Sequence, residues 1–174
     1  MAEAQLPRRV DALKLVDNNQ RFNAEIDSSK LSRLREAVEN CSAPVHCEIE
    51  FTRDRDDNRV VTGHCDTRVV MICQRCLGEV SLNIESSFQL GLVFTDEQAR
   101  QLPKRLEPAE MDEHGQLDLW TVMEDEALLA LPAFPTHKEG ECQLLQTPER
   151  GPDATDSDEK RANPFDVLAK LKQK

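Results

Sequence analysis

Apolar and polar residues alternate along residues 45–52, which is the pattern of a half-buried strand. A second β-prone run covers residues 60–73, and we expect it to bend or bulge near Gly63. A third covers residues 80–94, with a break expected at Ser86-Ser87. Three consecutive antiparallel strands would form a meander, and the apolar face of a meander needs a cover of helices or further strands.

The residues before this meander predict one more strand and a helix. Apolar residues alternate over residues 21–27, which indicates a strand. Residues 30–40 then place apolar side chains at helical spacing, with Ser28 or Ser29 as the expected N-cap. Asn40 and the proline at position 44 end this pattern.

Two helices are predicted after the meander. Thr95 with Gln98 three residues later has the form of a capping box, so a short helix should begin there. Asp118 is the expected cap of a longer helix that runs to about Leu131. One broad side of this helix is apolar and would cover the sheet, whereas Glu124-Asp125-Glu126 is expected on a solvated side, without a catalytic or metal-binding role.

These elements predict an α+β fold, an antiparallel β meander or partly open barrel-like sheet covered by helices. We expect residues 1–145 to form a single domain. Residues 146–161 are rich in Pro, Gly, Ser and Asp, which is typical of an acidic flexible linker. Residues 162–174 predict an amphipathic helical motif, because Pro164 suits the first helical position after an Asn cap.

The charge of the chain restricts its partners. The net charge is −11, and residues 107–126 alone carry eight acidic side chains with no Lys or Arg. Non-specific affinity for nucleic acid comes from Lys and Arg, so general nucleic-acid binding is disfavoured. Residues 160–174 are opposite in sign, with five basic side chains and one acidic. If RNA is contacted directly, the expected residues are Arg8, Arg9, Arg33, Arg35, Lys170, Lys172 and Lys174.

The chain begins without the apolar run of a signal peptide, and no apolar stretch approaches the roughly 20 residues of a transmembrane helix. We therefore expect a cytoplasmic protein. Six cysteines in such a protein are more often metal ligands or buried thiols than disulfides. Cys41, Cys47 and Cys65 are expected to be small buried residues.

The other three cysteines suggest a metal site. Cys73 and Cys76 lie in a turn between two predicted strands, and His137 and Cys142 follow the proline-rich exit of the long helix. Three cysteines and one histidine form one of the standard closed sets of zinc ligands. The sequence therefore predicts one structural Zn²⁺ per chain that clips a hairpin, with Gly78 permitting a tight turn whose amides point at the thiolates.

Two alternatives remain open for these residues. In the first alternative, Cys73 and Cys76 are ordinary hairpin residues and His137 lies in a loop. A redox pair is the third interpretation, although redox pairs of this spacing favour a helix N-terminus and these cysteines have strands on both sides. The sequence contains no phosphate-binding glycine loop, catalytic triad or metalloprotease motif, so we expect a protein that is not an enzyme.

The C-terminal motif is the best candidate for binding a partner. An amphipathic helix beyond an acidic linker can dock on its own domain or lie in the groove of another protein. The residues expected to make that contact are Asn163, Pro164, Phe165, Leu168 and Leu171.

Four motifs, in this order, resemble the YceD family of bacterial large ribosomal RNA subunit accumulation proteins. They are Cys73-Gln-Arg-Cys76, Val122-Met-Glu-Asp-Glu126, Leu131-Pro-x-x-Pro135-x-His137-x₄-Cys142 and Asn163-Pro-Phe-x-Val-Leu-Ala-x-Leu-Lys172. The resemblance extends from about Leu6 to the end of the chain. It departs from the family where relatives place a second pair of cysteines, because this chain has His137 and Cys142 there.

The resemblance implies a cytoplasmic role in the synthesis, processing or stability of large-subunit ribosomal RNA, without catalytic residues. We expect the partner to be a large-subunit precursor or an assembly protein, with direct RNA binding weak and no membrane or small-molecule substrate. The alternative is an interaction module that regulates a cytosolic enzyme.

Overall fold

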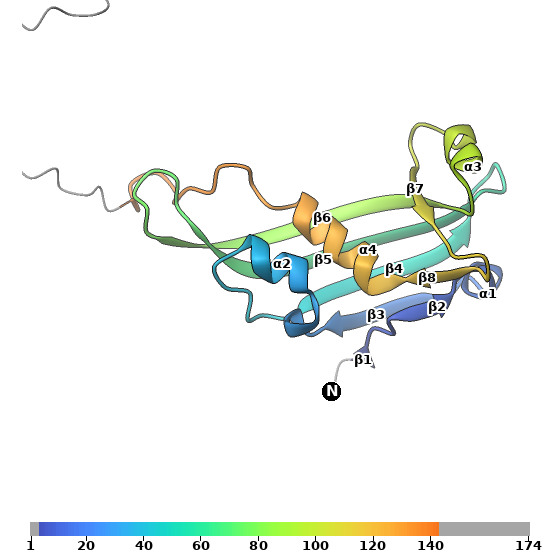
Figure 1. Ribbon diagram of the computed structural model, residues 1–174, viewed down its shortest axis with the longest axis horizontal. Helices are drawn as coiled ribbons and strands as arrows, with labels where there is room; N and C mark the ends of the chain where they lie inside the picture. Colours follow the sequence, from blue (N-terminus) through green and yellow to red (C-terminus); the bar gives the residue numbers. More distant parts are fainter. Residues whose placement is uncertain (1–3, 143–174) are drawn as a thin grey trace, which may run out of the picture. The chain divides into compact units, whose positions relative to one another are not determined.

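The computed structural model describes residues 4–142. The predicted linker and C-terminal motif lie outside the described residues. Six strands form one sheet in the spatial order β1-β3-β4-β5-β6-β7 (Figure 1). These strands are β1 (Ala4–Gln5), β3 (Arg21–Ile26), β4 (Val45–Arg53), β5 (Arg59–Ile72), β6 (Glu79–Val93) and β7 (Glu107–Glu110). Strands β3 to β6 are antiparallel neighbours, and β1 and β7 add in parallel at the two borders.

The predicted α+β class and the antiparallel meander are confirmed, and the sheet stays open rather than closing into a barrel. A small second sheet pairs β2 (Arg9–Asp11) with β8 (Gln116–Asp118). The helices are α1 (Ala12–Asp17), α2 (Ser32–Ala37), α3 (Asp96–Gln101) and α4 (Leu119–Leu129), with a 3₁₀ turn at Ser28–Lys30. Helices α2 and α4 lie over one face of the large sheet (Figure 1).

The expected bulge at Gly63 and the expected break at Ser86-Ser87 are wrong, whereas a bend near Gly63 stays a prediction. The pairing of β5 with β6 runs without interruption from Val60 opposite Gly91 to Ile72 opposite Glu79. There is therefore no bulge at Gly63 and no break at Ser86-Ser87. Gly63 serves packing instead, since a Cβ atom there would overlap the Phe88 ring and lie 2.8 Å from the Glu48 carbonyl oxygen.

The alternation that predicted β4 corresponds to burial. Val45, Cys47, Ile49 and Phe51 are buried, whereas the residues between them are exposed or half-buried. One side of α4 packs against this face of the sheet. Its residues Leu119, Met123 and Ala127 are almost fully buried. The predicted helix thus covers the sheet, and Asp118 caps it by accepting from the amide of Thr121 at 3.1 Å.

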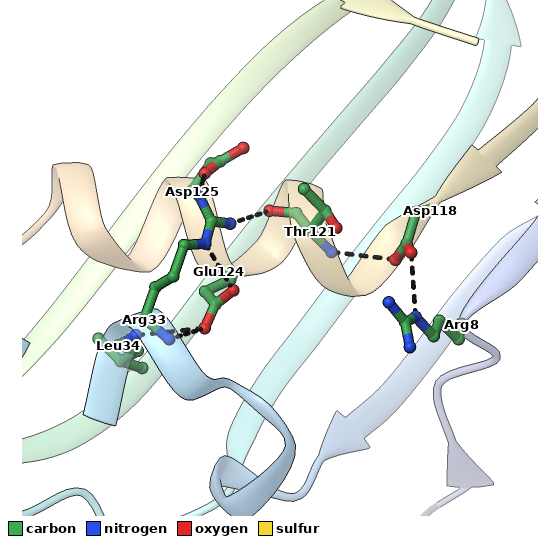
Figure 2. A network of polar contacts seen from close by, with 7 residues as sticks. All are labelled: Arg8, Arg33, Leu34, Asp118, Thr121, Glu124 and Asp125. Atoms are coloured by element: carbon green, nitrogen blue, oxygen red, sulfur yellow. Dashed lines mark hydrogen bonds and ion pairs between the residues drawn. The ribbon is translucent and has the colours of Figure 1, made fainter. Parts of the chain in front are cut away.

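The acidic side of α4 is the main correction to the sequence analysis. Glu124 and Glu126 are each only 7% exposed, so they do not lie on a solvated face. One oxygen of Glu124 accepts from the amides of Arg33 and Leu34, at 2.8 and 3.2 Å, and the other from Arg33 Nε at 2.9 Å (Figure 2). Glu126 accepts a hydrogen bond of 2.8 Å from the Ser86 hydroxyl.

Glu124 therefore caps the first turn of α2 from another helix. The expected caps, Ser28 and Ser29, lie in the 3₁₀ turn before it, where Asp27 accepts from the Ser29 amide. Helix α2 has no side-chain cap of its own. A carboxylate 91 residues away in the sequence supplies the acceptor that the first amides of a helix require.

Candidate metal centre

Cys73 and Cys76 lie in the turn between β5 and β6, as predicted. The Cys73 amide donates to the Gly78 carbonyl at 2.8 Å, and the Leu77 amide donates to the Cys73 carbonyl at 2.9 Å. The left-handed residue of this turn is Leu77, with φ of 60°, and not Gly78. The expectation that Gly78 makes the turn possible is therefore wrong, since a Cβ atom there would meet only Cys76 Sγ, at an ordinary 3.7 Å.

The segment after α4 brings the other two side chains to this turn. The amide of Gln74 donates to the Pro135 carbonyl at 2.8 Å, which fixes the chain beside the hairpin tip. Gly140, with φ of 85°, then reverses the chain, and the Glu141 amide donates to the Lys138 carbonyl at 3.2 Å. This reversal returns Cys142 to the side of His137 that faces the cysteines.

The four side chains converge at distances that suit zinc. Their ligand atoms all lie within 4.8 Å of one another. Cys73 Sγ lies 3.6 Å from Cys142 Sγ, and His137 Nδ1 lies 3.4 Å from Cys76 Sγ and 3.7 Å from Cys142 Sγ. In a tetrahedral zinc site two sulfurs stand about 3.8 Å apart, and a sulfur and a nitrogen about 3.5 Å. The cluster could therefore hold a metal ion with little rearrangement.

A backbone carbonyl orients the histidine. His137 Nε2 lies 2.9 Å from the Glu79 carbonyl oxygen, so Nε2 carries the proton and donates it there. Nδ1 is then left with its lone pair toward the three sulfurs. A ligating histidine is usually held by such a hydrogen bond from its other nitrogen, which fixes the tautomer and the ring orientation.

The thiols of the cluster have opposed proton affinities. Burial raises the pKa of Cys73, but backbone hydrogen bonds from Cys76, His137 and Arg75 outweigh it, and its pKa is lowered to about 5. Burial and the neighbouring Cys76 and Cys73 raise the pKa of Cys142 to about 11. The protein alone thus favours the thiolate of Cys73 and opposes that of Cys142, whereas a bound cation would stabilise the thiolates of all three cysteines.

Four protein ligands would leave no coordination position for water or substrate, which is the arrangement of structural zinc sites. Cys73 and Cys76 are buried in a small apolar cluster with Val80, apart from the main core. Such an ion would join the hairpin tip to the exit of α4. That the cluster binds zinc stays a prediction.

The remaining cysteines are buried away from this cluster. Burial raises the pKa of Cys47 to about 12 and that of Cys65 to about 11, and it also raises the pKa of Cys41. These thiols behave as small apolar groups, as expected from their strand positions.

Four of the residues named for RNA contact lie in the described part of the chain, and two of these four form ion pairs beside α4. Arg8 pairs with Asp118 at 3.0 Å, and Arg33 pairs with Glu124 at 2.9 Å and with Asp125 at 2.6 Å (Figure 2). Arg9 and Arg35 are exposed. Lys170, Lys172, Lys174 and the five residues named for partner binding lie outside the described residues, so their roles stay predictions.

The roles of Glu124 and Glu126 were missed by sequence reasoning. Three consecutive acidic residues in a helix carry no signal of which will be buried, because that depends on how α4 meets α2 and β6. Ser28 and Ser29 looked like adequate caps for the helix that follows them, so the sequence contained no sign that a distant carboxylate supplies the cap.

No helix among residues 4–142 is long and apolar enough to span a membrane.

Two comparisons with known proteins give the same family description. Residues 61–172 match the family model described as "Large ribosomal RNA subunit accumulation protein YceD". A curated protein of Haemophilus influenzae with that same description is 32% identical over 174 residues, covering 100% of both chains. No solved structure matches this chain.

Proposed function

The chain belongs to the YceD family of large ribosomal RNA subunit accumulation proteins, and from this membership we propose that it is a ribosome-biogenesis factor. Its role is to support the synthesis, processing or stability of large-subunit ribosomal RNA. The observation that carries this proposal is the match to the Haemophilus influenzae protein along the whole length of both chains.

The proposed mode of action is binding to a protein or to a pre-ribosomal particle, rather than to bare RNA. A net charge of −11 opposes approach to a phosphate backbone. Two of the arginines that might have offset it, Arg8 and Arg33, are held by Asp118, Glu124 and Asp125. Their charges are largely neutralised within the protein itself.

We further propose that the chain is not an enzyme and that its metal ion is structural. Cys73, Cys76, His137 and Cys142 would hold the ion with no open coordination position. Their contribution to function would be indirect, through the stability of the hairpin tip and of the chain that leaves α4.

The test is the ribosomal RNA profile of a strain that lacks the gene for this protein. We expect less large-subunit ribosomal RNA relative to small-subunit RNA, and recovery when the wild-type chain is supplied. An unchanged ratio in the deletion strain would contradict the proposal.

A second experiment tests the alternative, an interaction module that regulates a cytosolic enzyme. The full chain is used to capture partners from a cell extract treated with nuclease. Retention of ribosomal proteins or assembly factors supports the proposal. Retention of a single cytosolic enzyme, with no ribosomal component, would instead support a regulatory interaction module.

A further inference from the structure

One border of the large sheet is open along most of β6. Strand β5 pairs with β6 on one side from Glu79 to Gly91. On the other side β7 pairs only with Leu90–Val93, the far end of the strand (Figure 1). Within residues 4–142, no strand other than β7 pairs with β6 on that outer side, and β7 reaches only the last residues of β6. About ten residues of strand edge are thus available to another strand.

This edge lacks most of the features that normally prevent strand addition, and Glu85 is the one charged side chain of residues 80–89. Exposed edges are usually guarded by proline, lysine or a bulge. Residues 80–89 contain no proline and no basic side chain, and their register with β5 is unbroken. A regular, unguarded edge is the template for binding an extended peptide as an additional strand.

The walls beside this edge are acidic. A groove of about 1180 Å³ crosses the sheet from β3 to β6 and reaches this edge, where its lining includes Ser87, Gln89, Glu107 and Glu126. Glu107 begins β7, and Glu126 reaches β6 from α4 through the Ser86 hydroxyl. Both belong to the stretch of eight acidic residues without a cation.

These two carboxylates have no cationic partner within the described part of the chain. Arginines neutralise Asp118, Glu124 and Asp125 elsewhere in the same stretch. The groove's own arginines are engaged, Arg21 by Glu50 at 2.7 Å and Arg105 by Asp54 at 2.6 Å. The groove therefore presents uncompensated negative charge next to a free strand edge.

We propose that residues 80–89 of β6 receive an extended, lysine- or arginine-rich segment of a protein partner. The segment adds as a strand through main-chain hydrogen bonds and places basic side chains near Glu107 and Glu126. This inference rests on the proposed binding function and gives the chemistry of the partner. It also explains how an acidic protein can serve a ribosomal particle, by contacting basic protein rather than RNA.

Side chains of an added strand alternate between the two faces of the sheet. On one face they meet Phe88 and the largely exposed Leu129, and on the other they meet Ser87 and Gln89. Alternating basic and apolar residues match this surface. A second copy of the chain does not, because each copy has a net charge of −11 and neither β6 edge offers a basic side chain within residues 80–89.

The experiment adds the peptide Lys-Val-Lys-Val-Lys-Val-Lys-Val to the full chain and measures affinity and backbone hydrogen exchange. We expect binding that weakens with salt, together with slower exchange of the amides in residues 80–89. A peptide of the same sequence with alternate amides N-methylated keeps its charge but cannot form the ladder. It should bind about tenfold more weakly or worse, because the main-chain hydrogen bonds supply affinity.

Two matched variants test the acidic wall. Glu107→Gln should weaken binding of the lysine peptide by about threefold to tenfold. Glu113→Gln removes an equally exposed charge outside the groove and should bind as the wild type does.

Equal binding of the N-methylated peptide, or no slowing of exchange at residues 80–89, would overturn the inference. So would slow exchange there before any peptide is added. Sedimentation would then show what slows the exchange of these amides in the protein without peptide. A dimer would assign the slow exchange to a second copy, and a monomer would assign it to another segment of the same chain. None of these results alters the ribosomal RNA profile, so failure here is distinct from failure of the proposed function.

Discussion

Cys73 and Cys142 carry opposed proton affinities although their sulfur atoms lie only 3.6 Å apart. Three amides stabilise the Cys73 thiolate, whereas burial and then the neighbouring Cys76 and Cys73 oppose ionisation of Cys142. A cation is the simplest way to remove the conflict.

The metal prediction is tested by Cys76→Ser. Elemental analysis of the purified wild type should give about one zinc per chain, and the variant should give none. Its free energy of unfolding should fall by several kcal/mol, because metal affinity contributes to stability when the site forms only on folding. Cys41→Ala, which removes a buried thiol outside the cluster, should keep its zinc. A wild-type protein without metal would contradict the prediction.

Glu126 gives a prediction about pH. Burial raises the pKa of this carboxyl above its ordinary 4.5, and the neighbouring Glu107 and Asp125 add to the effect. The native state therefore holds the proton more tightly than the unfolded state, so stability is highest below the unfolded pKa and falls as pH rises through the native pKa.

Glu126→Gln mimics the protonated form and keeps an oxygen that can accept from Ser86. The variant should be about 1 kcal/mol more stable than the wild type at pH 7 and equal to it near pH 4. Urea denaturation at both pH values measures the difference. Glu113→Gln, an exposed control, should show no such dependence, and a gain that persists at pH 4 would rule out this explanation.

At the scale of elements, α2 depends on α4. Helix α2 has six residues and no side-chain cap of its own, so its first amides are satisfied by Glu124. Isolated helices of this length are not stable in water. The position of α2 is therefore set by a tertiary contact rather than by its own sequence.

Glu124→Ala should consequently destabilise the protein by about 1–3 kcal/mol, since it leaves buried amides and Arg33 without their acceptor. Hydrogen exchange should rise first in residues 32–37. Asp125→Asn is the matched control, because Asp125 contacts the same arginine from a half-exposed position, and it should cost no more than about 1 kcal/mol. If both variants have the same small effect, Glu124 does not act as the cap.

Local periodicity predicted the elements well where it was strong. The alternation in β4 and the caps at Thr95 and Asp118 needed only neighbouring residues to be recognised, and the structure contains all three features. The spacing of Cys73, Cys76, His137 and Cys142 predicted a cluster that the structure forms. The predictions that were wrong concerned contacts between segments far apart in the sequence.

Gly63 and Glu124 are the instructive failures. Glycine in a strand suggests a bulge, but here it makes room for the Phe88 ring on the neighbouring strand. Acidic residues in a helix suggest solvent, but Glu124 meets the start of another helix. Neither partner can be identified without knowing the register and the crossing of the elements.

At the scale of the whole molecule, stability is divided between two regions. The main core lies between the sheet and α4, and the cluster around Cys73, Cys76 and Val80 lies apart from it. The candidate metal centre therefore supports the end of the hairpin that the main core does not reach.

Removal of metal by a chelator should accordingly act locally first. Amide exchange should accelerate in residues 73–80 and 135–142, while the amides of β4 keep most of their protection. Reloading with zinc should restore the slow exchange. Uniform acceleration throughout the sheet would show instead that the whole fold depends on the ion.

The order in which the ligands are synthesised has a consequence of its own. Cys76 leaves the translating ribosome 66 residues before Cys142, an interval of about 3–13 s at bacterial elongation rates. During that interval strands β4, β5 and β6 can pair, but the hairpin tip holds only half of its donor set. Closure of the cluster waits until α4 and its exit have been made. A nascent chain truncated before position 137 would keep an open, reactive pair of thiols, which would distinguish it from a finished molecule.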